Sequence, residues 1–177
     1  MKARTYVLIL ILIMTVLIVA DSSASASNIE IFHQAVKSGD AAEVKRLIEA
    51  GADVNVQDNI GRTALMWASK SGHTKRYTEI VKLLIEAGTE VNTQDINGYT
   101  ALMYVSVLGN IEVAKLLIEE GADVSAKDGM GNIALWYASK RGHQGIVKVL
   151  IEAGADANAK NEKEKTALVA GIEGRTP

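Results

Sequence analysis

Short blocks of apolar residues with a helical period follow one another along most of the chain. In the block at 79–87, Ile80, Leu83 and Leu84 have the i, i+3, i+4 spacing of an amphipathic helix. Each such block is preceded by a shorter apolar block and ends at a glycine, which readily closes a helix in the left-handed conformation. The pattern therefore predicts antiparallel pairs of short helices. The expected helices are 64–71 paired with 79–87, and 101–108 paired with 111–120.

The helix pairs are copies of one sequence unit. Asp95, Asp128 and Asn161 each open a similar turn, and they follow one another at intervals of 33 residues. A single pair of helices cannot bury its apolar face alone, so such units must stack on their neighbours. The interval from Asp58 to Asp95 is 37 residues, which leaves a four-residue insertion near 74–77.

The insertion has two interpretations. Four residues make about one helical turn, so the second helix of this unit can lengthen without rotating its apolar face. The same residues could instead form a contact loop that presents Lys75, Arg76 and Tyr77.

The 33-residue interval, the D-x-x-G-x-T-x-L turn and the G-A-D-V-N segment resemble those of the ankyrin repeat. The resemblance implies an all-α solenoid of stacked helix-turn-helix units with short β-hairpin-like turns, about four helix pairs plus a partial C-terminal repeat. Glu164 departs from the pattern, because it stands where the turn should have glycine. Within an ankyrin domain at 27–177, the expected units are an N-capping repeat at 28–57, a repeat with the insertion at 58–94, repeats at 95–127 and 128–160, and a partial repeat at 161–177.

The first 26 residues have the composition of an export signal. Lys2 and Arg4 precede an apolar run at 6–20, and small residues follow, ending at Ala26. This order predicts a signal peptide, 1–26, that is cleaved after Ala26. A retained membrane anchor is the alternative, although the run is shorter than the roughly 20 residues of a spanning helix. We therefore expect an exported protein, periplasmic or secreted by a bacterium, with inner-membrane anchoring as the second choice.

Composition excludes several kinds of chemistry. Among 177 residues there is no cysteine, which rules out disulfides, cysteine-ligated zinc and a thiol nucleophile. The net charge of -2 gives no basic footprint for nucleic acid. The sequence also lacks the H-E-x-x-H, G-x-S-x-G and P-loop motifs. We expect a protein that is not an enzyme and takes no cofactor, metal or small-molecule substrate.

The resemblance implies a monomeric scaffold that binds a protein partner through its hairpin tips and the concave face of its inner helices. The alternatives are a membrane-tethered version of this scaffold and a secreted effector directed at a host. Mapping by repeat position selects the candidate partner-binding residues Ile60, Arg62, Trp67, Lys70, Tyr99, Tyr104, Val107, Leu108, Met130, Tyr137, Lys140 and Arg141.

One repeat position carries an aromatic side chain throughout, at Trp67, Tyr104 and Tyr137. These rings either form an exposed strip at the interface or pack between neighbouring inner helices. Lys140 and Arg141, with the lysines at the ends of other inner helices, give the concave rim a positive bias. The sequence therefore favours an acidic or mixed partner.

Overall fold

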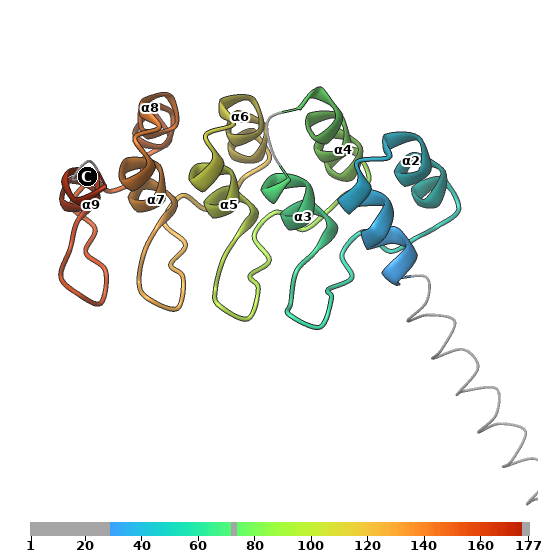
Figure 1. The fold of residues 1–177 in the computed structure, drawn as a ribbon, viewed down its shortest axis with the longest axis horizontal. Coiled ribbons are helices and arrows are strands. Elements are labelled where there is room, and N and C mark those ends of the chain that lie inside the picture. Colours follow the sequence, from blue (N-terminus) through green and yellow to red (C-terminus); the bar gives the residue numbers. More distant parts are fainter. Residues whose placement is uncertain (1–28, 72–73, 175–177) are drawn as a thin grey trace, which may run out of the picture.

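The computed structural model describes residues 29–71 and 74–174, and Figure 1 shows them as a curved stack of helix pairs. The predicted signal peptide, 1–26, lies outside the described residues. A helix at 29–38 opens the stack and is followed by α2 (Ala41–Glu49). The other helices are α3 (Ala64–Lys70), α4 (Lys75–Glu86), α5 (Ala101–Leu108), α6 (Ile111–Glu119), α7 (Ala134–Arg141), α8 (Gln144–Glu152) and α9 (Ala167–Glu173).

The helices form two layers. The inner helices α3, α5, α7 and α9 pack side by side in one row, and the outer helices α2, α4, α6 and α8 form the second row behind them (Figure 1). The segments that join an outer helix to the next inner helix project from the stack, and we call them hairpins. This arrangement confirms the predicted all-α solenoid of paired helices.

The inner helices α3 and α5 are each capped by the threonine that precedes them. The hydroxyl of Thr63 accepts a hydrogen bond from the Met66 amide, and that of Thr100 accepts one from the Met103 amide. These bonds satisfy amides that the first turn of a helix leaves free. At the other end of α5, Gly109 has a φ of 91°, the left-handed conformation expected of a glycine that closes a helix.

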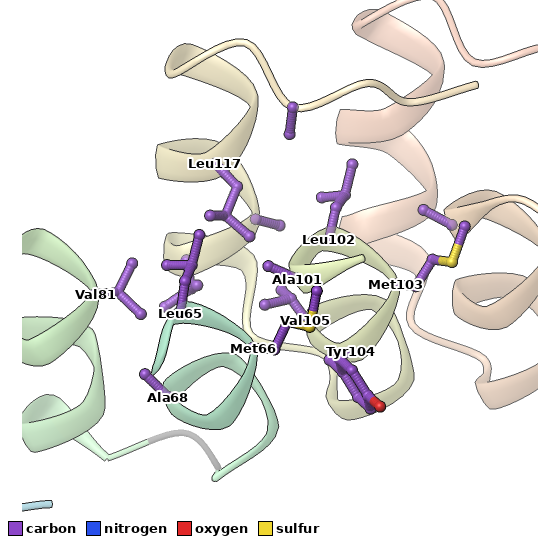
Figure 2. Packing of buried hydrophobic residues seen from close by; sticks show 14 of the residues in the cluster. Leu65, Met66, Ala68, Val81, Ala101, Leu102, Met103, Tyr104, Val105 and Leu117 are labelled. Carbon is purple, nitrogen blue, oxygen red and sulfur yellow. The ribbon is translucent and has the colours of Figure 1, made fainter. Parts of the chain in front are cut away.

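The core lies between the two layers and runs along the whole stack. Leu65, Leu102 and Leu135 occupy one repeat position on the inner helices, and each is only 1% exposed. They meet outer-helix residues such as Leu117, and Figure 2 shows Leu65, Leu102 and Leu117 gathered between neighbouring repeats. Since each repeat contributes half of such an interface, the apolar face of every helix pair is buried by its neighbour.

Neighbouring hairpins are joined by backbone hydrogen bonds. The Ile96 amide donates to the Ile60 carbonyl at 3.2 Å. The Gly129 amide donates to the Asn97 carbonyl at 2.8 Å, and the next hairpin along continues the row. These bonds set the spacing between adjacent hairpins.

The four-residue insertion lengthens an outer helix. α4 has 12 residues, whereas α2, α6 and α8 have 9 each. The predicted start at 79 is therefore wrong, because the helix already begins at Lys75. Tyr77 donates its hydroxyl proton to the Lys37 carbonyl at 2.9 Å, and Arg76 donates to the Ser38 carbonyl at 3.3 Å. The extra turn therefore covers the end of the helix at 29–38, which favours the lengthened-helix interpretation over a contact loop.

The last inner helix differs from the others. α9 follows a turn in which Glu164 has a φ of 57°, a conformation that glycine adopts at the equivalent positions of the other turns. Leu168 and Ile172 on α9 are 73% and 61% exposed. They line an apolar hollow of about 630 Å³ beside α8, where an outer helix would pack next to the other inner helices. The lining of this hollow contains none of the candidate partner-binding residues, so we do not assign it to the candidate site.

A candidate partner-binding groove

The hairpin turns at 58–62, 95–99 and 128–132 are each organised by one acidic side chain. In the turn at 95–99, Oδ1 of Asp95 accepts hydrogen bonds from the Asn97 amide at 2.9 Å and the Tyr99 amide at 3.0 Å. Asp58 and Asp128 make the same two bonds in their own turns. The carboxylate thus fixes the shape of the turn.

The second carboxylate oxygen reaches the inner helix. Nε1 of Trp67 donates to Asp58 at 2.9 Å, and the Tyr104 hydroxyl donates to Asp95 at 2.6 Å. The Tyr137 hydroxyl donates to Asp128 in the same way. In every case the aromatic residue follows the acid by nine positions. This carboxylate–aromatic pair joins the turn to the helix behind it.

The final repeat has neither half of the pair. Asn161 takes the place of the acid, and Ala170 takes the place of the aromatic residue. Oδ1 of Asn161 still accepts from two amides of its turn, while its Nδ2 donates to Asn132 at 2.8 Å. Both partners of the carboxylate–aromatic pair are therefore absent from the same repeat.

The tyrosines of these pairs are largely buried, unlike the side chains of an exposed binding strip. Tyr104 and Tyr137 are only 8% and 7% exposed, and the ring of Tyr99 lies 5.3 Å and 5.2 Å from theirs. The prediction of an exposed aromatic strip is therefore wrong for Tyr104 and Tyr137. Their hydroxyls bond to the turn aspartates, and their rings pack against Tyr99. Trp67 is half-buried.

Burial and hydrogen bonding keep the two tyrosines neutral. The pKa of Tyr104 is raised to about 12, chiefly by burial and then by its bond to Asp95. The pKa of Tyr137 is raised further, by burial and by its bonds to Asp128 and Tyr99. For Asp58, burial alone would raise the pKa, but hydrogen bonds from the turn amides and Trp67 outweigh burial and lower it.

His33 lies close to this network and is 2% exposed. Burial lowers its pKa below the ordinary 6.5 and Lys37 adds to this, whereas Asp58 and the Val56 carbonyl oppose it. The folded protein therefore binds the proton more weakly than the unfolded chain. Stability from neutral His33 is complete above about pH 6.5 and is lost as the pH falls through 6.5 toward the lower folded pKa.

We therefore expect the urea midpoint of unfolding to fall between pH 7.5 and pH 5.5, and to fall less in a His33→Gln variant. Glutamine remains neutral across this range, so it removes the protonation of this one site. Equal decreases in both proteins would contradict the assignment to His33.

Side chains from three successive repeats enclose a groove of about 880 Å³ between the hairpins and the inner helices. All the predicted partner-binding residues line it except Ile60 and Trp67. Both of these are half-buried beside it. The complete lining is Arg62, Lys70, Ile96, Asn97, Tyr99, Tyr104, Val107, Leu108, Asp128, Gly129, Met130, Trp136, Tyr137, Lys140 and Arg141.

Sequence reasoning missed Trp136. Its ring packs edge-on against Tyr137 at 5.0 Å, and Nζ of Lys140 lies 4.6 Å above it. The equivalent positions in the two preceding repeats carry Met66 and Met103, which are buried, so repeat position gives no sign that this ring reaches the groove.

The groove is positively charged. Arg62, Lys70, Lys140 and Arg141 contribute four cations to its wall. The acid that lines it, Asp128, is 7% exposed and is engaged by its own turn and by Tyr137. The carboxylate of Asp128 is therefore buried, whereas the side chains of Lys70, Lys140 and Arg141 are exposed.

Arg62 is the cation that is held in place. Its Nε donates to the Tyr104 hydroxyl at 3.0 Å and lies 3.5 Å from Oδ2 of Asp95. Its Cζ lies 4.9 Å from the centre of the Trp67 ring. The contacts with Tyr104 and Asp95 cross to the next repeat, so Arg62 links two adjacent hairpins on the groove side.

Two other kinds of site are not found in 29–71 and 74–174. No helix in these ranges is both long enough and apolar enough to cross a membrane. Over the same residues, no group of three or more histidine, aspartate or glutamate side chains is placed to hold a metal ion.

Comparison with known proteins agrees with the architecture. A family model described as "Ankyrin repeats (3 copies)" matches residues 13–95, 32–128 and 74–161. A search of the curated proteins found no match.

Proposed function

Since the chain belongs to the ankyrin repeat family, which implies a protein-binding scaffold, we propose that it binds its partner in the groove between the hairpins and the inner helices. One observation carries this proposal. Residues chosen for their repeat positions, in three different repeats, line one groove of about 880 Å³. A groove of this size, with aromatic and cationic walls, suits a segment of another protein.

The chemistry of the groove favours binding over catalysis. The hydroxyls of Tyr104 and Tyr137 are engaged by Asp95 and Asp128, and their raised pKa values keep them protonated at neutral pH. The same bonds occupy the carboxylates, which leaves neither a free base nor an activated nucleophile among these groups.

The place where the scaffold works is a prediction from residues 1–26. An exported scaffold, cleaved after Ala26, is the location that this segment favours. A membrane-tethered scaffold and a secreted effector directed at a host are the alternatives. All three would use the same groove.

Selection from a random peptide library tests the groove without assuming a ligand. We expect the full chain to recover peptides whose binding a Lys140→Glu/Arg141→Glu variant weakens at least about tenfold, because reversed charges repel what the native cations attract. Both residues are exposed, so the fold should survive, and circular dichroism will verify this.

A matched control carries the same change of charge on the outer face. Lys115→Glu/Lys148→Glu places two reversed charges on exposed positions of α6 and α8. This variant should bind the selected peptides like the native chain. Peptides that are lost equally from both variants, or from neither, would place the binding surface outside the groove.

A further inference from the structure

Three cations surround the indole ring of Trp67. Nζ of Lys37 lies 4.1 Å from the ring centre, Cζ of Arg62 lies 4.9 Å away, and Nζ of Lys70 lies 5.4 Å away. The ring's electron-rich face attracts each of them, yet three like charges so close together repel one another. We call Lys37, Arg62 and Lys70 the cation cluster. Arg62 and Lys70 line the groove, whereas Lys37 reaches the same Trp67 ring from the preceding inner helix, outside the lining.

Within the residues that the structure describes, Arg62 is the one member of the cation cluster that forms an ion pair with the protein. Arg62 lies near Asp95, but that carboxylate also accepts the Tyr104 hydroxyl proton and two turn amides. Within the ranges that the structure describes, neither Lys37 nor Lys70 forms an ion pair. An anionic group placed among the three would therefore relieve repulsion as well as gain attraction.

A second group of cations lies toward the other end of the groove. Nζ of Lys140 lies 4.6 Å above the ring of Trp136, and Arg141 is the next residue of α7. Both are exposed, line the groove and form no ion pair in the described part of the chain. We call Lys140 and Arg141 the cation pair.

Repeat positions relate the two groups. Lys37, Lys70, Val107 and Lys140 occupy the same position at the end of four successive inner helices. Along the stack this position is therefore cationic, cationic, apolar and cationic. Val107 is followed by Leu108, and both line the groove between the cation cluster and the cation pair.

The distance along the stack fixes the length of a matching ligand. Lys70 and Lys140 are two inner helices apart, on α3 and α7, and adjacent packed helices lie about 8–10 Å apart. The two groups are thus roughly 16–20 Å apart. An extended peptide advances about 3.3 Å per residue, so it crosses this gap in roughly five or six residues.

We propose that the groove binds an extended acidic segment of a protein partner, in which two groups of carboxylates about five or six residues apart flank an apolar side chain. One carboxylate group meets the cation cluster and the other meets the cation pair. The apolar side chain lies between them against Val107 and Leu108. This inference rests on the proposed function, since it names the chemistry of the partner that the groove receives.

Synthetic peptides with a variable spacer test the arrangement. Each peptide carries two Glu-Glu pairs joined by a spacer of one to eight residues. The spacer consists of glycine and serine with leucine at its centre. A fluorescein label allows anisotropy titrations against the full chain. Spacers of three to four residues, which set the pairs about five to six residues apart, should bind at least about tenfold tighter than a spacer of one. Replacing each glutamate by glutamine should weaken binding by a similar factor, and added salt should weaken it further.

Paired variants locate the two contacts. Lys37→Gln/Lys70→Gln and Lys140→Gln/Arg141→Gln should each weaken the best peptide about tenfold, whereas Lys115→Gln/Lys148→Gln on the outer face should not. The chain's two tryptophans add a local readout, because Trp67 lies in the cation cluster and Trp136 beside the cation pair. In Trp136→Phe and Trp67→Phe variants, the remaining tryptophan should change its fluorescence when a matched peptide binds.

The outcomes separate this inference from the proposed function. Affinity that does not depend on spacer length, or that survives both groove variants, overturns the two-contact arrangement. If the random library yields peptides that bind in the groove without two acidic groups, the scaffold proposal stands and this inference fails. If the library yields no groove-dependent peptide, both fail.

Discussion

Replacing Asp128 by alanine is expected to lower the free energy of unfolding by about 3 kcal/mol, measured by urea denaturation followed by circular dichroism. The carboxylate accepts bonds from the Met130 and Asn132 amides, each at 2.8 Å, and from the Tyr137 hydroxyl. Asn132 and Tyr137 are buried, so water cannot replace the lost acceptor. Each buried donor left without a partner costs about 1–3 kcal/mol.

A double-mutant cycle separates the two tasks of the carboxylate. Asp128→Asn keeps one oxygen for the turn amides but loses the oxygen that receives the Tyr137 hydroxyl. Tyr137→Phe removes the hydroxyl instead. If the pair joins turn to helix, the combined variant will cost less than the sum of the single variants, by about 1 kcal/mol. Strictly additive costs would show that the pair is not coupled.

Replacing Gly98 by alanine is expected to destabilise the protein by about 3 kcal/mol. Gly98 has a φ of 79°, a left-handed conformation that costs a residue with a Cβ roughly 1–2 kcal/mol. An added Cβ would also lie 2.8 Å from the amide nitrogen of Gly129 and 2.9 Å from Cα of Asp128. Both are backbone atoms of the next hairpin, so the two hairpins must move apart.

Gly121 provides the matched control for Gly98. Its φ of 83° is almost the same, but an added Cβ would meet nothing within 4 Å. Gly121→Ala should therefore cost only the conformational part, roughly 1–2 kcal/mol. Equal losses in the two variants, again from urea denaturation, would mean that the close approach of adjacent hairpins contributes nothing.

Repetition made much of the fold predictable. A helix of nine residues is too short to be stable alone, but four aligned copies show which positions are apolar in every repeat. The capping threonines Thr63 and Thr100 and the closing glycine Gly109 were readable in the same way. The start of α4 could not be predicted in this way, because the inserted Lys75-Arg76-Tyr77 has no apolar period. This segment is held by hydrogen bonds to the preceding repeat.

The candidate site was predictable by position but not by exposure. Repeat positions brought most of its lining together, from Arg62 to Arg141. They did not reveal that Tyr104 and Tyr137 are buried, because an aromatic side chain at a fixed position can face either solvent or protein. A signal was present in the spacing of nine residues between each turn acid and its aromatic partner, and in the joint loss of both at Asn161 and Ala170.

The backbone bonds between hairpins affect how a ligand is received. Because adjacent hairpins are tied at Ile60–Ile96 and Asn97–Gly129, one wall of the groove has its shape before anything binds. A preorganised receptor loses little conformational entropy on association. The ordering cost then falls almost entirely on the flexible segment that binds, so a segment already held straight in its parent protein would bind more tightly than the same sequence as a free peptide.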